Sequence, residues 1–189
     1  MRVLDIGCGP GYLVEYFPDA EYVGIDIDEK YIRYAQRRYA GRGHFASMYV
    51  TRDSLKTFEP FDVVVLAGVL HHVSDSEAVS LLAALRDALK PGGKVVTLDC
   101  CYVLNQSRIA KFLIDNDRGK FVRDPASFES LARSAFTTVH SEIRQDLFQI
   151  PYTLLVITYL RSDGGQILRL TPAATERRAV DPSYVRSKI

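Results

Sequence analysis

Residues 2–13 read RVLDIGCGPGYL, and this stretch decides the fold. The apolar run Arg2–Ile6 is typical of a buried strand, and it leads into a turn that holds Gly7, Gly9 and Gly11. Glycine has no side chain and tolerates positive φ, so such a turn lets the backbone approach a ligand closely. The stretch therefore predicts a strand, a glycine turn and a ligand site at the start of the chain.

The spacing of the three glycines distinguishes between two kinds of nucleotide site. They follow the pattern Gly-x-Gly-x-Gly, whereas a dinucleotide-binding turn places its third glycine one residue later, where Tyr12 stands here. Pro18 ends the next helix early, which leaves little helix dipole for a pyrophosphate. The turn argues against a nicotinamide oxidoreductase.

An acidic residue follows the second predicted strand, Glu21–Ile25. Asp26 comes about 20 positions after the turn, where a carboxylate can accept hydrogen bonds from both hydroxyls of a ribose. Asp28 is better explained as the N-cap of a helix over Glu29–Tyr39. We predict Asp26 as a ribose ligand, and the alternative is that it only caps the helix.

Strands and helices alternate along the rest of the chain. Further strands are predicted over His44–Met48, Phe61–Leu66, Lys94–Asp99, Phe136–Ile143 and Thr153–Leu160, and further helices over Ser76–Leu89 and from Asp124-Pro125 onward. Only Arg144–Tyr152 separates the last two strands, so they are expected to form an antiparallel hairpin. The pattern predicts an α/β fold, a doubly wound three-layer sandwich whose mostly parallel sheet ends in an antiparallel edge hairpin.

The composition fits one globular domain, with 47% hydrophobic and 25% charged residues. We expect residues 1–161 to form this domain and residues 162–189, which are turn-rich and charged, to form a loosely packed tail or a partner-binding arm. A net charge of +1 favours neither nucleic acid nor a membrane as partner, and no apolar run approaches the length needed to cross a bilayer. The three cysteines cannot all pair, which favours a reducing compartment such as the cytoplasm.

Four segments together resemble the class I S-adenosylmethionine-dependent methyltransferases. VLDIGCGPGYL looks like motif I of that family, and VGIDIDEKYIRYAQRR is similar to its second motif. FDVVVLAGVLHHVSD resembles the fourth strand with the loop that lines the cofactor pocket, and LLAALRDALKPGGKVVTLD resembles the next helix, turn and strand. The resemblance covers about half the chain and implies a seven-stranded sheet with a reversed last strand.

The resemblance also assigns residues to an S-adenosylmethionine site. It implies that Asp5 and the three turn glycines hold the methionine end and that Asp26 binds the ribose. Ile27 would contact one face of the adenine, and the near wall of the pocket would consist of Ala67, Gly68 and His71. The third motif of the family usually brings an acid to the adenine amino group. That acid is missing here, and Ser47 or a backbone group would take its place while Met48 packs on the ring.

Methyl transfer from a sulfonium is an in-line displacement, so alignment of the nucleophile and exclusion of water matter most. His71 and His72 are candidates for a general base, because imidazole titrates near neutral pH. A role in shaping the pocket is the preferred interpretation for both. The sequence has no histidine or cysteine partners at ligand spacing, so no metal site is predicted and the three cysteines are interpreted as structural.

We expect a small-molecule acceptor with an oxygen or nitrogen nucleophile. Ligands of open α/β sheets bind beyond the carboxyl ends of the strands, so acceptor recognition is predicted in Cys101–Arg123 and Gln145–Tyr152. The side chains available there are Tyr102, Arg108, Lys111, Phe112, Arg123 and Tyr152.

Two alternatives stay open at this point. The first is a methyltransferase that acts on RNA or protein, although no basic block interleaved with aromatic residues supports it. The second is a non-catalytic cofactor-binding module, which could form a homodimer through its edge hairpin. This second alternative is favoured by the missing third-motif acid and by the start of the chain, where only Met1 and Arg2 stand in place of the helices that commonly cover the cofactor in the family.

Overall fold

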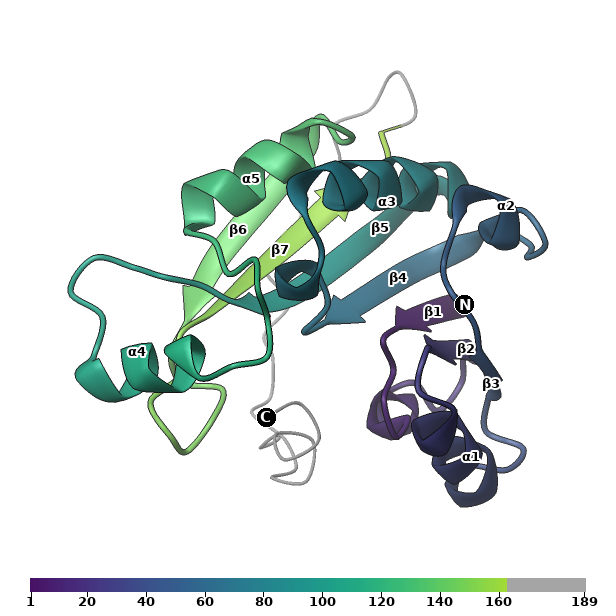
Figure 1. Cartoon of the computed structure of the whole chain (residues 1–189). Helices are drawn as coiled ribbons and strands as arrows, with labels where there is room; N and C mark the ends of the chain where they lie inside the picture. Colours follow the sequence, from purple (N-terminus) through teal and green to yellow (C-terminus); the bar gives the residue numbers. More distant parts are fainter. Residues whose placement is uncertain (163–189) are drawn as a thin grey trace.

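The computed structural model describes residues 1–162 and shows a twisted seven-stranded sheet with helices on both faces (Figure 1). The strands are β1 (Arg2–Ile6), β2 (Glu21–Asp26), β3 (His44–Ser47), β4 (Phe61–Ala67), β5 (Leu89–Cys100), β6 (Thr138–Arg144) and β7 (Leu154–Leu160). The α-helices are α1 (Glu29–Arg38), α2 (Arg52–Leu55), α3 (Asp75–Ala88), α4 (Arg108–Asp115) and α5 (Pro125–Arg133). Two short 3₁₀ helices, η1 (Tyr12–Tyr16) and η2 (Leu70–His72), follow β1 and β4.

The strand order is β3-β2-β1-β4-β5-β7-β6. Strands β1 to β5 pair in parallel, whereas β7 runs antiparallel to both β5 and β6. This confirms the predicted doubly wound architecture with a seven-stranded sheet and an antiparallel hairpin at one edge. The prediction of a tail over residues 162–189 lies, beyond Ser162, outside the described residues.

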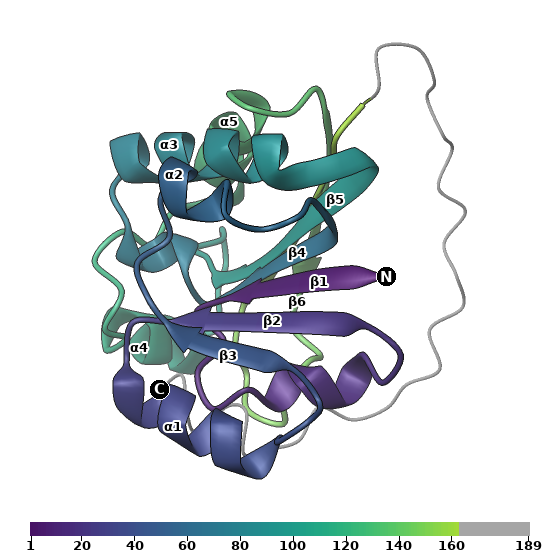
Figure 2. The same cartoon turned by 90° about the vertical axis from the view of Figure 1, so that its right-hand side faces the viewer.

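Each face of the sheet has its own hydrophobic core. Helices α2, α3 and α5 cover one face and α1 covers the other (Figure 2). Leu82 and Leu85 of α3 belong to the larger cluster, and both are fully buried. Ile32 and Ala35 of α1 belong to the smaller one. Burial of apolar surface on both faces explains the continuous apolar run Val63–Ala67 in the central strand β4.

The segment Pro91-Gly92-Gly93 differs from the prediction. We predicted that it ends a helix and precedes a strand, but α3 already ends at Ala88 and the segment lies inside β5 as an irregularity of the strand. The physical reason is that Leu89 pairs with Phe61 of β4 before the register shifts. The predicted helix is otherwise present, and Ser74 begins it with a capping box.

Two helices were not predicted, α2 and α4. Helix α4 follows the N-cap Ser107, whose side chain accepts a hydrogen bond from the Ala110 backbone nitrogen. It buries Ala110 and Ile114, and Ile114 belongs to a small third cluster that includes Cys100 and Tyr152. Among the described residues, no helix is long and apolar enough to cross a membrane.

Candidate functional site

The glycine turn after β1 has the open backbone that the sequence predicts. Gly7, Gly9 and Gly11 all adopt positive φ, at 68°, 55° and 83°. A β-carbon added at Gly9 would meet no heavy atom within 4 Å. The backbone at Gly9 therefore faces open space, which a ligand can enter without displacing a side chain.

Asp26 ties the turn to the end of β2. One carboxylate oxygen accepts a hydrogen bond from the Gly9 backbone nitrogen at 2.8 Å, and the other accepts from the Asp28 backbone nitrogen at 2.8 Å. The N-cap of α1 is Asp28, whose side chain accepts from Lys30. Asp26 is thus not the helix cap, and its half-buried carboxylate lies at the turn where the ribose is predicted.

The residues predicted to hold the adenine lie beside Asp26. Ile27 is 62% exposed, so a ligand can reach its side chain. The Ser47 hydroxyl donates to the Ile27 carbonyl at 3.3 Å, and the Met48 backbone nitrogen donates to the Asp26 carbonyl at 3.2 Å. The structure therefore brings these three predicted residues together, although they come from two separate stretches of sequence.

The remaining predicted cofactor residues lie at or near the same edge of the sheet. Ala67 ends β4, and Gly68 follows it with positive φ and donates its backbone nitrogen to Leu98 of β5 at 2.7 Å. Asp5 is buried within β1 and accepts a hydrogen bond from the phenol of Tyr22. Its carboxylate is already engaged within the protein, so its contact with the methionine end stays a prediction.

His71 lies buried between two carboxylates. Its Nδ1 lies 2.7 Å from Asp99 Oδ1, and its Nε2 lies 3.2 Å from Asp117 Oδ1. The side chains of the three residues are 6%, 3% and 5% exposed. Because both ring nitrogens face carboxylates inside the protein, this arrangement favours the structural interpretation of His71 over general base catalysis.

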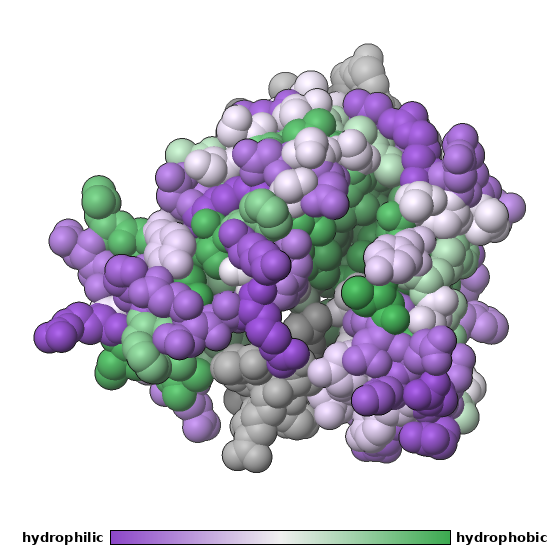
Figure 3. Space-filling view, viewed as in Figure 1, coloured by the Kyte–Doolittle hydropathy of each residue, from purple (hydrophilic) through white to green (hydrophobic). Residues whose placement is uncertain are grey.

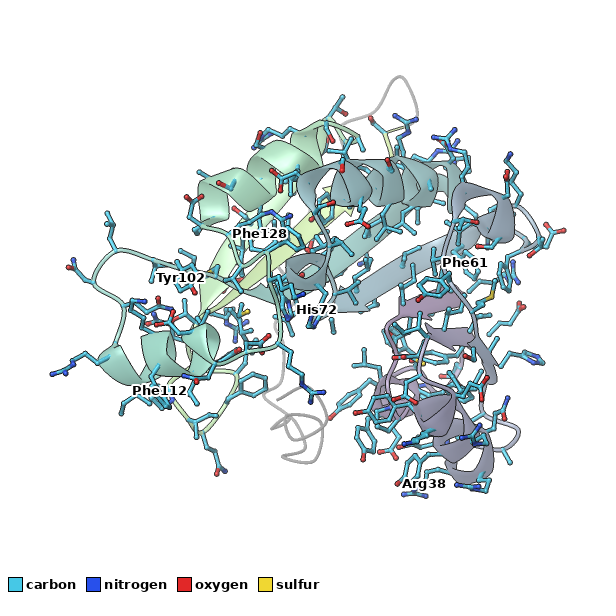
Figure 4. The ribbon with its side chains drawn as sticks, viewed as in Figure 1. Arg38, Phe61, His72, Tyr102, Phe112 and Phe128 are labelled. Atoms are coloured by element: carbon cyan, nitrogen blue, oxygen red, sulfur yellow. The ribbon has the colours of Figure 1, made fainter. Side chains whose placement is uncertain are left out.

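His72 is the second candidate base, and its surroundings differ. It is exposed, and its ring centroid lies 4.1 Å from that of His71. Figure 4 shows His72 beyond the end of β4, on the side toward β1, β2, β3 and α1. Of the two histidines, His72 is the one whose ring solvent or a substrate can reach.

Arg123 does not present its charge to a ligand, contrary to its predicted availability for the acceptor. Its guanidinium donates to the carbonyls of Leu70, Phe121 and Val73, each at 2.8 Å, and to the Asp75 carboxylate at 2.8 Å. The side chain is 8% exposed. Arg123 therefore holds η2, the start of α3 and its own segment together.

The other residues suggested for acceptor recognition are divided between the surface and the interior. Phe112 is 66% exposed on α4, where Figure 4 labels it. The Tyr102 phenol donates to Asp115 at 2.9 Å, whereas Tyr152 is 9% exposed and packs in the third cluster.

Burial raises the pKa of the Cys100 thiol to about 12, and the nearby Asp117 carboxylate adds to this effect.

The contacts of His71 with Asp99 and Asp117 could not be predicted from the sequence. His71 lies 28 positions before Asp99, and Asp117 comes from the segment that follows α4. No motif of fixed spacing joins these residues, so only the fold reveals their proximity. The surface is hollowed below α3, where hydrophobic side chains are visible (Figure 3).

Comparison with known proteins agrees with this geometry. Residues 4–95 match a family model described as a methyltransferase domain. The chain is 31% identical over 154 residues to phosphoethanolamine N-methyltransferase 1 of Arabidopsis thaliana. The aligned region covers 78% of this chain and 31% of the plant protein. It is 38% identical over 100 residues to a ubiquinone biosynthesis O-methyltransferase of Bradyrhizobium, and this aligned region covers 51% of this chain and 38% of that protein. The chain thus spans roughly a third of the length of these two relatives.

Solved structures share the fold at lower identity. An S-adenosylmethionine-dependent methyltransferase of Methanosarcina mazei superposes with a TM-score of 0.68 at 18% identity, covering 85% of this chain and 92% of the other. Phosphoethanolamine N-methyltransferase 2 of Haemonchus contortus, in complex with phosphomonomethylethanolamine and S-adenosylhomocysteine, superposes with a TM-score of 0.67 at 18% identity. That match covers 86% of this chain and 49% of the nematode protein. These likenesses support the fold.

Proposed function

Because the chain belongs to the class I S-adenosylmethionine-dependent methyltransferases, we propose that it transfers a methyl group from S-adenosylmethionine to a nitrogen or oxygen atom of a small molecule. The observation that carries this proposal is the Asp26 carboxylate held against the open backbone of Gly9. An acid at the end of the second strand beside a glycine turn is the arrangement that receives a ribose in nucleotide-binding sheets.

The proposed cofactor site runs along the carboxyl edge of β1, β2, β3 and β4. Asp26 would accept the ribose hydroxyls, Ile27 and Met48 would sandwich the adenine, and Ser47 would supply a polar contact at its edge. The open turn at Gly9 leaves room for the methionine part, with Ala67 and Gly68 on the opposite wall. This placement directs the sulfonium methyl toward η2 and the end of β5.

Catalysis in this proposal rests on positioning. The chemistry is a single displacement in which the acceptor lone pair forms the new bond to the methyl carbon while the sulfur takes the electrons of the old one. Alignment of such a pair contributes a large share of the rate. An acceptor hydroxyl or ammonium must also lose a proton, and His72, with its exposed ring, is placed to accept it.

The relatives suggest where to look for the acceptor. Two of them are named for N-methylation of phosphoethanolamine and for O-methylation in ubiquinone biosynthesis. We propose primary amines and phenols as the first acceptor classes. A cytoplasmic location and a homodimer formed through β6 stay predictions.

Methyl transfer can be tested directly with S-adenosylmethionine labelled in its methyl group. The purified chain is incubated with a panel of small amines and phenols, with total RNA and with a protein mixture as separate arms. The proposal expects label in a small molecule, and it expects the Asp26→Ala variant to lose that activity. Label only in RNA or protein would assign the macromolecular alternative instead, and no label in any arm, with the cofactor bound, would favour the non-catalytic module.

A further inference from the structure

Three potential metal ligands meet beneath η2. They are His71 of η2, Cys100 at the end of β5 and Asp117 just after α4. One donor atom from each lies within 4.8 Å of the other two. His71 and Cys100 are 4% and 2% exposed, and the Asp117 side chain is 5% exposed. Three buried donors of this kind at this spacing are unusual unless a cation or a proton joins them.

The imidazole is oriented as it is in metal sites. The Asp99 carboxylate accepts from His71 Nδ1 at 2.7 Å, and the same oxygen accepts the His71 backbone nitrogen at 3.1 Å. A carboxylate behind one ring nitrogen fixes the tautomer and directs the lone pair of the other nitrogen forward. Here that other nitrogen is Nε2, which lies 3.2 Å from Asp117 Oδ1.

Nε2 is buried and makes no hydrogen bond to any group in residues 1–162, although Asp117 Oδ1 is only 3.2 Å away. A lone pair and a carboxylate oxygen that face each other need a positive charge between them. Two ligands bound to one tetrahedral zinc ion at about 2.0–2.1 Å are separated by about 3.3 Å. The observed separation matches that of two ligands on one ion.

The backbone holds the third ligand in place. The Gly119 nitrogen donates to Asp117 Oδ1 at 2.7 Å, and the Phe121 nitrogen donates to the His71 carbonyl at 2.9 Å. A β-carbon at Gly119 would lie 2.1 Å from His71 Cδ2, so only glycine allows this close approach. The segment therefore lies directly against η2, and Asp117 faces the imidazole.

We infer that His71, Cys100 and Asp117 form a binding site for a divalent transition metal of the zinc type. Imidazole and thiolate favour zinc or cobalt over magnesium and calcium, which prefer oxygen ligands. The thiolate and the carboxylate together balance the charge of a divalent ion. On binding, sulfur forms a bond to the metal and the thiol proton leaves to water, with no change of oxidation state.

Tyr152 lies at the border of the inferred site. Its phenol donates a hydrogen bond to Asp117 Oδ2 at 3.4 Å, and both Tyr152 and Cys100 belong to the third cluster. The ion would link η2, β5 and the segment after α4. Its role is structural, since it orders the acceptor side of the sheet, and it does not depend on the proposed methyl transfer.

Cobalt(II) titration of the reduced, metal-free full chain tests this site. Cobalt bound to a thiolate gives a near-ultraviolet charge-transfer band, and tetrahedral cobalt gives intense visible bands. We expect both bands to saturate at one equivalent and to disappear when zinc(II) is added. Absence of both bands in the folded wild-type chain would overturn the inference.

Matched cysteine variants locate the ligand. Cys100→Ser should abolish the charge-transfer band, whereas Cys101→Ser, at the equally buried neighbouring residue, should keep it. Asp117→Asn should weaken cobalt binding by at least about 10-fold, because loss of a direct ligand costs no less than loss of a supporting partner. Where Cys100→Ser does not fold, Asp117→Asn and the zinc-induced rise in Tm of the wild type provide the same test. A charge-transfer band that persists in Cys100→Ser, or that is lost only in Cys101→Ser, would show that the assignment is wrong.

Discussion

The two ends of the carboxyl edge of the sheet are built in different ways. At the β1 and β2 end, the proposed cofactor site is built on the glycine turn and Asp26, and Gly9 and Asp26 are only 17 positions apart in the sequence. At the β4 and β5 end, a buried network joins η2 to the segment after α4, and its residues are far apart in the sequence. The first end is organised by local motif, and the second by the fold.

The largest effect is expected at the second end, from Arg123→Ala. Three backbone carbonyls lose a charged donor inside the protein, so the free energy of unfolding should fall by about 3 kcal/mol in urea titrations. The folded variant should still bind S-adenosylhomocysteine. Arg133→Ala is the control, because that arginine is 55% exposed and 3.7 Å from Glu129, and it should change stability by less than about 1 kcal/mol. Equal losses in both variants would refute the structural role of Arg123.

The next largest effect belongs to the first end. Asp26→Ala removes an ionised acceptor from the proposed ribose site, so affinity for S-adenosylhomocysteine should fall by about 10- to 100-fold. Asp28→Ala makes the same change of charge two residues later, at an exposed helix cap. Calorimetry should show nearly normal affinity for that control. Equal weakening in the two variants would mean that only general charge matters.

A smaller effect on cofactor affinity is expected in the glycine turn, where backbone strain and obstruction of the cofactor by an added side chain can be measured separately. Gly9→Ala places a methyl group in open space where the cofactor is proposed, so affinity should fall by about tenfold. Gly41→Ala is a matched control, because Gly41 also has positive φ, at 76°, and also has nothing within 4 Å of an added β-carbon. Both variants should lose about 1 kcal/mol of stability from backbone strain. If Gly9→Ala binds the cofactor as the wild type does, the ligand does not lie over Gly9.

The smallest effect concerns the opposite edge of the sheet, where Asp62 links β4 to its neighbours β1 and β5. Asp62 of β4 accepts hydrogen bonds from Lys90 and from the Arg2 backbone nitrogen, and both lower the pKa of its carboxyl. A carboxyl whose pKa is lowered by folding stabilises the folded state at pH values above its ordinary pKa of about 4. This stabilisation is lost as the pH falls through the pKa of the folded state. Asp62→Asn should therefore be slightly less stable than the wild type at pH 7, and the difference should shrink in acid. Urea titrations at pH 7 and in acid measure this difference in the free energy of unfolding. Asp19→Asn is the control, because Asp19 is exposed. A difference between Asp62→Asn and the wild type that grows in acid would contradict the assignment.

The contrast between the ends also explains what the sequence predicts. The strands, the glycine turn and Asp26 follow from patterns within short segments, because local geometry alone places Gly9 beside the end of β2. The hairpin of β6 and β7 followed from the length of one connection. These features need no knowledge of the packing.

The β4 and β5 end could not be predicted in this way. Arg123 looked like a surface cation available to a ligand, but its burial depends on how the segment after α4 crosses η2. The approach of Cys100 and Asp117 to His71 likewise depends on long-range packing, which ligand spacing along the chain does not record. The inserted irregularity at Gly92 in β5 was missed for the same reason, since pairing with β4 decides it.

The central claim is that the open turn and Asp26 bind an adenosyl methyl donor. The most direct test is calorimetric titration of the purified chain with S-adenosylmethionine, S-adenosylhomocysteine and NAD. The account predicts that both adenosyl ligands bind with Kd values in the micromolar range and that NAD does not bind. Tighter binding of NAD, or no binding of either adenosyl ligand to the folded chain, would contradict it.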